Sequence, residues 1–141
     1  MNALFDTSVL VAAFYEDHEH HRESFAIVAK HKPKEACCAA HTLAEVYATL
    51  TAMPGAKRVS PAEAVLYLSS LRERLTLISL TGQDYIDAAE LAAASGAVSG
   101  GVYDALIGQA FVKSKAKWLY TWNLKHFTRL IGGVGDRARQ P

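Results

Sequence analysis

Short apolar runs alternate along this chain with longer segments of mixed polarity. The apolar runs have the length of buried strands and cover residues 2–5, 35–40, 75–80 and 117–122. The segments between them predict helices. The first starts at Thr7 or Ser8, and a short one lies near the end of the chain. The others cover residues 17–31, 42–53, 61–74, 81–95 and 102–114. This alternation indicates a mostly parallel sheet covered on both faces.

Local motifs support several of these boundaries. Ser60, Pro61 and Glu63 form a helix start, with a Ser N-cap, Pro at the first helical position and Glu at the third. Pro54 and Gly55 end the helix before it. The chain contains no repeat, low-complexity tract or linker. We therefore expect a single α/β domain over residues 1–141, with an α/β/α arrangement of three layers.

Composition narrows the class of protein without identifying it. Half of the 141 residues are hydrophobic and 21% are charged, as in ordinary soluble proteins. The apolar run from Val9 to Tyr15 is too short to cross a bilayer, and no basic segment precedes it as in a secretory leader. Cys37 and Cys38 are adjacent, which suits neither a CxxC metal pair nor an ordinary disulfide. We expect buried thiols and a cytoplasmic protein.

Charge is distributed unevenly along the chain. Residues 1–112 hold 8 Lys and Arg against 13 Asp and Glu, a balance of −5. Residues 113–141 hold 7 Lys and Arg against a single acid, Asp136, a balance of +6. A basic C-terminal part is suited to contact a phosphate backbone. A solvated basic face with no partner is the alternative.

Asp6 is the first carboxylate that needs an explanation. It lies between two apolar runs, and no Lys or Arg occurs within fifteen residues on either side. Burial of an unpaired carboxylate is costly. Two interpretations remain open: Asp6 caps the helix that follows, or it faces a cation that is not part of the chain. Because Asp6 closes one strand, and Thr121 and Asn123 close another, parallel pairing would bring all three to one sheet edge.

Asp104 is the only charged residue between Gly101 and Val112. A helix that is apolar on all sides is a buried helix, so we expect Asp104 to be buried or to line a cleft. The alternative is an Asp in the first helical turn, satisfied by backbone amides and the helix dipole.

Glu45 lies on a predicted helix but away from its core stripe. That stripe consists of Leu43, Val46, Tyr47 and Leu50. Glu45 shares the other face with Thr42 and Thr49, and taken alone it would be an exposed Glu. Its helix follows the second strand closely, which places Glu45 near the same sheet edge as Asp6.

The remaining acids and histidines favour structural interpretations. One helix face is expected to be solvated and carries Asp84, Asp87 and Glu90. A histidine group near a helix start lacks the Cys or further His that would complete a zinc shell. It consists of His18, His20 and His21.

Three carboxylates at one sheet edge would repel one another by roughly 3 kcal/mol per pair, at about 5 Å and an effective dielectric near 20. A cluster of oxygens without His or Cys suits a hard cation such as Mg²⁺ or Mn²⁺. The chemistry that this favours is metal-assisted hydrolysis of a phosphodiester.

The order and spacing of these motifs resemble the PIN-domain ribonucleases, and within them the VapC-type toxins of bacterial toxin–antitoxin pairs. The motifs run through the chain in order: Phe5–Ser8, Leu43–Val46, Tyr103–Ile107 and Thr121–Phe127. The C-terminal part is also similar, at Arg129, Leu130, Ile131, Val134, Arg137, Arg139 and Pro141.

The resemblance implies a metal site and its surroundings. The positions that correspond to the metal carboxylates are Asp6, Glu45 and Asp104. Asn123 stands at a fourth position that is often acidic, and its neutral amide lowers the charge of the site. The hydroxyl positions that hold water, metal or phosphate correspond to Ser8 and Thr121. His126 stands where another acid is common, and we expect it to support a ligand or contact the substrate.

The resemblance also implies the activity and the partners. We expect an Mg²⁺- or Mn²⁺-dependent endoribonuclease toxin that leaves a 5′-phosphate and a 3′-hydroxyl, forms a homodimer and is inhibited by a cognate antitoxin. An apolar groove near Phe14, Phe25 and Tyr47 is expected to hold part of that partner. The candidate RNA contacts are Lys125 and Arg129, with Lys113 and Arg137 as further candidates.

Three other functions fit less well. A catalytically weak or inactive PIN-like module that binds metal or RNA for regulation is the main alternative. A phosphoryl-accepting receiver needs paired early acids, but Asp6 is the only acid before residue 16. A DNA nuclease of the same kind would need a helical arch, for which the chain has no room.

Overall fold

The computed structural model of the chain describes residues 1–130 and 133–141. Its sheet has five strands, all parallel, in the order β3-β2-β1-β4-β5. The strands are β1 (Ala3–Phe5), β2 (Ala36–Ala39), β3 (Thr76–Ile78), β4 (Trp118–Tyr120) and β5 (Ala138–Arg139). The predicted strands are confirmed, although each is shorter than its apolar run. The two-residue β5 was not predicted, and Ile131 of the C-terminal motif lies outside the described residues.

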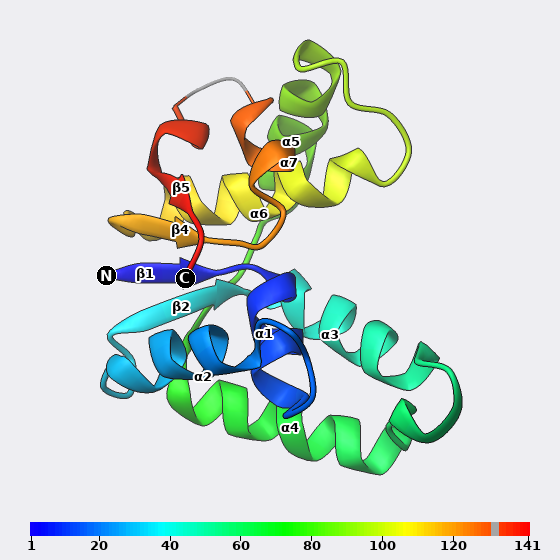
Figure 1. Cartoon of the computed structure of the whole chain (residues 1–141). Helices are drawn as coiled ribbons and strands as arrows, with labels where there is room; N and C mark the ends of the chain where they lie inside the picture. Colours follow the sequence, from blue (N-terminus) through cyan, green and yellow to red (C-terminus); the bar gives the residue numbers. More distant parts are fainter. Residues whose placement is uncertain (131–132) are drawn as a thin grey trace.

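Helices cover both faces of the sheet, so the α/β/α prediction is confirmed (Figure 1). One layer consists of α1 (Thr7–Phe14), α2 (His21–Lys30), α3 (Ala40–Ala52) and α4 (Pro61–Arg74). The other consists of α5 (Gly82–Ala94), α6 (Gly101–Ser114) and α7 (Leu124–Thr128). Two short 3₁₀ turns are η1 (Gly55–Lys57) and η2 (Gly135–Arg137). Among the described residues, no helix has the length and apolar character needed to cross a membrane.

The central strand β1 supplies side chains to both cores. Leu4 packs into the core under α5 and α6, whereas Ala3 and Phe5 pack into the core under α1 to α4. Successive residues of a strand point to opposite faces, so a fully apolar strand is what two cores require. All three residues are 0% exposed. Cys37 and Cys38 of β2 are divided between the two cores in the same way, and both are buried thiols, as predicted.

The predicted helix over residues 17–31 begins later, at His21, and its apolar stripe was wrong in part. Val28 is buried, but Phe25 is 57% exposed. Ser24 takes the inward position instead, because its hydroxyl oxygen accepts a hydrogen bond of 2.7 Å from Trp122 Nε1. A polar partner for the indole N–H thus replaces an apolar side chain at this point of the core.

Candidate active site

The strands β1 and β4 end side by side, since Phe5 pairs with Tyr120 in the parallel register. The next residues, Asp6 and Thr121, are therefore neighbours, and Thr121 Oγ1 donates a hydrogen bond of 2.8 Å to Asp6 Oδ2. Ser8 Oγ donates to the same carboxylate oxygen at 2.9 Å. The structure thus brings the predicted carboxylate and both predicted hydroxyls together at one sheet edge.

Asp6 also caps α1, because its Oδ1 accepts a hydrogen bond of 2.7 Å from the backbone N–H of Thr7. Its two interpretations are therefore compatible: one oxygen caps the helix, while the residue lines an open cavity. Asp6 is 3% exposed. Burial raises the pKa of Asp6, and the hydroxyls of Thr121 and Ser8 oppose that rise. No cation of the described residues pairs with this carboxylate.

The same hydroxyls fix the loop that follows β4. Ser8 Oγ accepts a hydrogen bond of 3.0 Å from the backbone N–H of Trp122. Thr121 Oγ1 accepts one of 2.9 Å from the backbone N–H of Asn123. Each hydroxyl donates to Asp6 and accepts from this loop, so the position of Asn123 depends on the position of Asp6.

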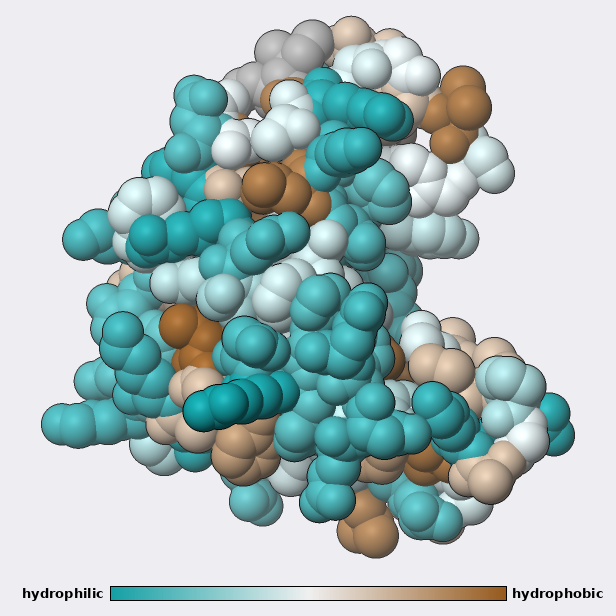
Figure 2. All heavy atoms as spheres, viewed as in Figure 1, coloured by the Kyte–Doolittle hydropathy of each residue, from teal (hydrophilic) through white to brown (hydrophobic). Residues whose placement is uncertain are grey.

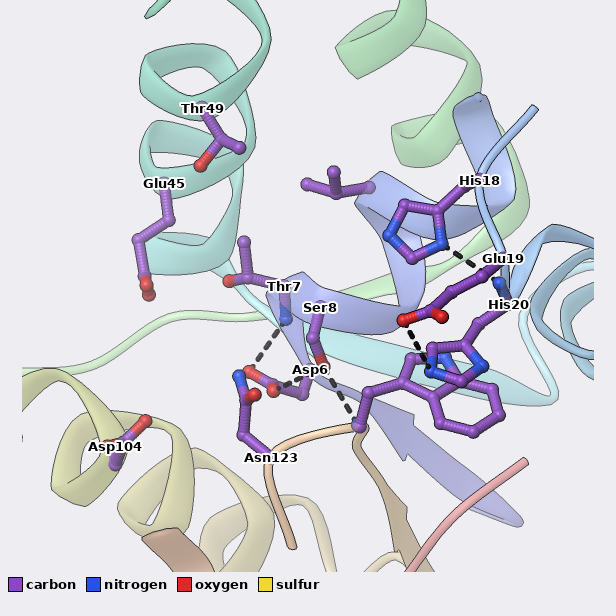
Figure 3. A pocket seen from close by; sticks show the side chains of 12 residues that line it. Asp6, Thr7, Ser8, His18, Glu19, His20, Glu45, Thr49, Asp104 and Asn123 are labelled. Carbon is purple, nitrogen blue, oxygen red and sulfur yellow. Dashed lines mark hydrogen bonds and ion pairs between the residues drawn. The ribbon is translucent and has the colours of Figure 1, made fainter. Parts of the chain in front are cut away.

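A cavity of about 480 Å³ lies beside Asp6 at the carboxyl ends of the strands. Figure 2 shows the surface hollowed on the right, between the layer that holds α6 and the layer that holds α3. Glu45 of α3 and Asp104 of α6 face this cavity from one side (Figure 3). The other lining residues are Thr7, Ser8, Val11, His18, Glu19, His20, Thr49, Trp122 and Asn123.

Glu45 is destabilised in its charged form. Its buried Oε1 has no hydrogen-bond partner, and His41 Nε2 lies 3.7 Å from it, itself without a hydrogen bond. Burial, followed by repulsion from Asp6 and Asp104, raises the pKa of Glu45 to about 7. The sequence alone suggested an exposed Glu. The structure instead places this side chain at 25% exposure, in the wall of the cavity.

Asp104 lies in the first turn of α6, and its carboxylate meets a histidine from another element. His126 Nδ1 lies 3.2 Å from Asp104 Oδ2. Burial raises the pKa of Asp104, and His126 opposes this rise while Asp6 adds to it. Asp104 lines a cleft, as expected, and His126 contacts it, while the role of His126 stays a prediction.

These side chains fit a hard divalent cation that keeps several waters. The donors are carboxylate and amide oxygens, and Glu45 presents a buried oxygen without a hydrogen-bond partner. In the part of the chain that the structure describes, no group of three or more His, Cys, Asp or Glu forms a ready-made metal shell. An open site with water ligands is what Mg²⁺ favours, whereas a structural Zn²⁺ site would be closed.

The predicted basic contacts fall into two groups. Lys125 lines a cavity with Asn123, and Arg129 lines another with Asp104, so both flank the site. The other two lie elsewhere. Lys113 Nζ forms an ion pair of 2.8 Å with Asp84, and Arg137 stacks on Phe111. Asp84, predicted to be solvated, thus has a partner of opposite charge.

The predicted partner groove is not formed as expected. Phe14 packs against Tyr15 and Tyr67 and lines a cavity with residues of η1 and α4. Neither Phe25 nor Tyr47 lines that cavity. Phe25 instead lies on the exposed side of α2, beside His21.

Several cavity residues were not predicted as site residues. His18 and His20 were considered only as a zinc group, and Glu19 and Thr49 carried no interpretation. Trp122 lies between two predicted residues, Thr121 and Asn123, so its position in the motif was the one available indication. The turns over residues 16–20 bring the histidines to the cavity, and no periodic pattern marks them.

Known proteins resemble this chain in sequence and in structure. The family model described as "PIN domain" matches residues 3–130. Ribonuclease VapC27 of Mycobacterium tuberculosis is 30% identical over 112 residues, 79% of this chain and 78% of that protein. Ribonuclease VapC40 of the same species is 32% identical over 114 residues, 81% of each chain.

Solved structures share the fold at lower identity. M. tuberculosis VapC20, described as a sarcin–ricin loop cleaving toxin, superposes with a TM-score of 0.73 at 16% identity, over 89% of this chain and 92% of its own. A toxin–antitoxin complex from Klebsiella pneumoniae superposes with a TM-score of 0.69 at 20% identity, over 99% and 98%.

Proposed function

The chain belongs to the PIN-domain family, and from this premise we propose that it is an Mg²⁺- or Mn²⁺-dependent endoribonuclease that acts as a toxin. The observation that carries the proposal is the convergence of Asp6, Glu45 and Asp104 on one cavity. Relatives at 30% and 32% identity that are named ribonucleases support RNA as the substrate.

The residues of the site have separate roles in this proposal. Asp6, Glu45 and Asp104 hold the divalent ion, directly or through water. Held there, such an ion would supply a water activated for attack on the phosphate and a positive charge against the one that develops.

Other residues position these groups. Ser8 and Thr121 orient the Asp6 carboxylate through their hydrogen bonds and oppose the rise of its pKa that burial causes. The Asn123 amide is placed to orient a water or a phosphate oxygen at the cavity. Lys125 and Arg129 contact the phosphate backbone on either side of the site.

We also propose that a cognate antitoxin inhibits the enzyme, and the similarity to the toxin–antitoxin complex from Klebsiella supports this. Within the described residues, the cavity has carboxylates but no lysine or arginine in its lining. An arginine of the inhibitor could therefore pair bidentately with one of the carboxylates. The enzyme is proposed to be a cytoplasmic homodimer, each copy a single PIN-like domain over residues 1–141.

The first test is RNA cleavage by the purified protein with Mg²⁺, with Mn²⁺ and with a chelator. We expect cleavage only with metal, and a loss of at least a hundredfold in Asp104→Asn, which removes a charge with little change of shape. Products should carry 5′-phosphates. Full activity of Asp104→Asn would contradict the assignment of the site. An inactive wild type that still binds RNA and metal would favour the regulatory module.

A test in cells addresses the toxin and its inhibitor. Expression of the wild type should arrest growth, Asp6→Ala should abolish the arrest, and a small protein encoded beside this chain should restore growth. Harmless overexpression of folded, metal-loaded wild type would contradict the toxin proposal.

A further inference from the structure

Histidine and tryptophan side chains make up much of the cavity wall opposite Glu45 and Asp104. Figure 3 shows His18, Glu19 and His20 on this wall, in the segment between α1 and α2. Trp122 lines the same cavity from the end of β4. The metal-dependent chemistry proposed above gives these side chains no role.

Two hydrogen bonds hold Trp122 in place, and His20 stacks on it. The indole N–H donates to Ser24 Oγ at 2.7 Å, while the backbone N–H donates to Ser8 Oγ at 3.0 Å. The His20 imidazole stacks on the indole with ring centroids 3.8 Å apart and planes inclined by 8°. The His20 side chain is still 36% exposed, so part of this ordered ring remains accessible.

The charge on this wall argues against a phosphate as its ligand. No Lys or Arg of the described chain lines the cavity, and the Glu19 carboxylate lies 3.4 Å from His20 Nε2. A carboxylate repels a phosphate group, whereas a flat ring can stack on any nucleobase. The wall therefore suits the base of a nucleotide better than its phosphate.

The cavity has room for a base beside the metal. The cavity measures about 480 Å³, within the range of pockets that hold small organic ligands. Single-stranded RNA is commonly bound by stacking of its unpaired bases on aromatic and histidine rings.

We infer that His20, supported by Trp122, is a stacking site for one unpaired nucleobase next to the scissile phosphate. The inference rests on the proposed function and adds to it the part of the RNA that the enzyme recognises. A base must leave the helical stack to reach this ring, so the substrate is unpaired at that nucleotide.

The test uses a short single-stranded RNA that the wild type cleaves, obtained from a randomised pool, with its cleavage site mapped. A series of RNAs then carries an abasic residue at one position at a time. We expect one abasic position beside the cleavage site to raise KM by about 5- to 150-fold, the range of base–aromatic stacking, with little change in kcat. In His20→Ala, the intact RNA should show a similar rise in KM, and the abasic position should have no further effect.

Two variants separate stacking from folding. His20→Phe keeps a flat ring and should retain the sensitivity to the abasic position. Phe25→Ala removes an exposed ring on α2 that does not line the cavity, and it should behave as the wild type. A uniform KM over the whole abasic series, or full sensitivity in His20→Ala, would overturn the stacking site alone. Wild type that cleaves no RNA with either metal would instead refute the proposed function.

Discussion

At the scale of single residues, the surroundings of Glu45 oppose its charged form. Its pKa rises from 4.5 to about 7 because it is buried and faces two other carboxylates. The native protein therefore holds a proton on Glu45 that the unfolded chain releases between about pH 4.5 and 7. Since the native state binds more protons in this window, its stability falls as pH rises. The full effect corresponds to roughly 3 kcal/mol.

Glu45→Gln tests this effect on stability in the metal-free protein. Gln has nearly the shape of the protonated acid and cannot ionise, so the variant should be more stable than the parent at pH 7.5, by about 1–3 kcal/mol, and nearly equal at pH 4.5. Urea unfolding at both pH values measures the difference. A variant that is less stable than the parent at pH 7.5 would show that Glu45 has a stabilising partner.

With divalent metal bound, the parent should become more stable than Glu45→Gln at pH 7.5. An ion that binds only the native state stabilises it by about 2.7 kcal/mol at a hundredfold excess over its Kd. Glu45→Gln should lose most of that gain because it lacks a ligand charge. A titration of the parent with metal should show weaker binding at pH 5 than at pH 7.5, since the proton on Glu45 competes with the metal.

At the scale of elements, the pairing of β1 with β4 creates the site. The register that aligns Phe5 with Tyr120 is what allows Thr121 Oγ1 to reach Asp6 Oδ2. Thr121 is 0% exposed and both donates and accepts through one hydroxyl. Its removal would leave the backbone N–H of Asn123 and the Asp6 carboxylate without this partner.

Thr121→Val should therefore destabilise the protein by about 1–3 kcal/mol, the usual effect of leaving buried polar groups unpaired. It should also reduce RNA cleavage, because Asn123 and Asp6 lose their common support. Thr121→Ser keeps the hydroxyl and should recover most of both. Chemical unfolding and initial cleavage rates give the comparison, and a Val variant as stable as the Ser variant would show that the hydroxyl is dispensable.

Elements were predictable from the sequence where one physical rule decided them. Four strands followed from apolar runs, and the start of α4 from its Ser cap and Pro, which the hydrogen bond from Glu63 N to Ser60 Oγ confirms. The start of α2 was misplaced because residues 16–20 form turns without a periodic pattern. The inward Ser24 also escaped prediction, since its partner Trp122 lies 98 positions away.

Site residues could be predicted from the sequence where a single charged residue stood in an apolar segment. Asp6 and Asp104 stood out as lone charges in apolar segments, and both line the cavity. Glu45 did not stand out, and only its closeness to the second strand and the family motif suggested it. The ring pair of His20 and Trp122 depends on a tertiary contact, so neither residue's own surroundings indicate it.

At the scale of the whole molecule, the basic C-terminal part is less uniform than its net charge suggests. Lys113 is paired with Asp84, and Arg137 donates to Ala116 O and stacks on Phe111. The structure leaves Lys125 and Arg129 beside the site. Of the four predicted RNA contacts, these two therefore lie beside the proposed active site.

Neutralisation of both Lys125 and Arg129 to Gln should weaken RNA binding for all sequences. It should also reduce the slope of log Kobs against log salt by about 1.4, since each contact to a single strand contributes about 0.7. Lys113→Gln is the matched control and should leave the slope unchanged. The measurement is RNA binding over a series of salt concentrations, made in the Asp104→Asn background so that the RNA is not cleaved. An unchanged slope in the double variant would show that these two residues are only solvated.

The order of strands in the sheet has a consequence for protein synthesis. β1 is made first but lies in the middle, and its neighbour β4 is made more than one hundred residues later. Asp6 and Glu45 leave the ribosome while Asp104 and Thr121 are still to be translated. A nascent chain at this stage therefore has Asp6 and Glu45 but lacks β4, the strand beside which Asp6 is positioned. Under the proposed function, the ribosome and its messenger RNA would therefore meet only chains with an incomplete site until translation has passed β4.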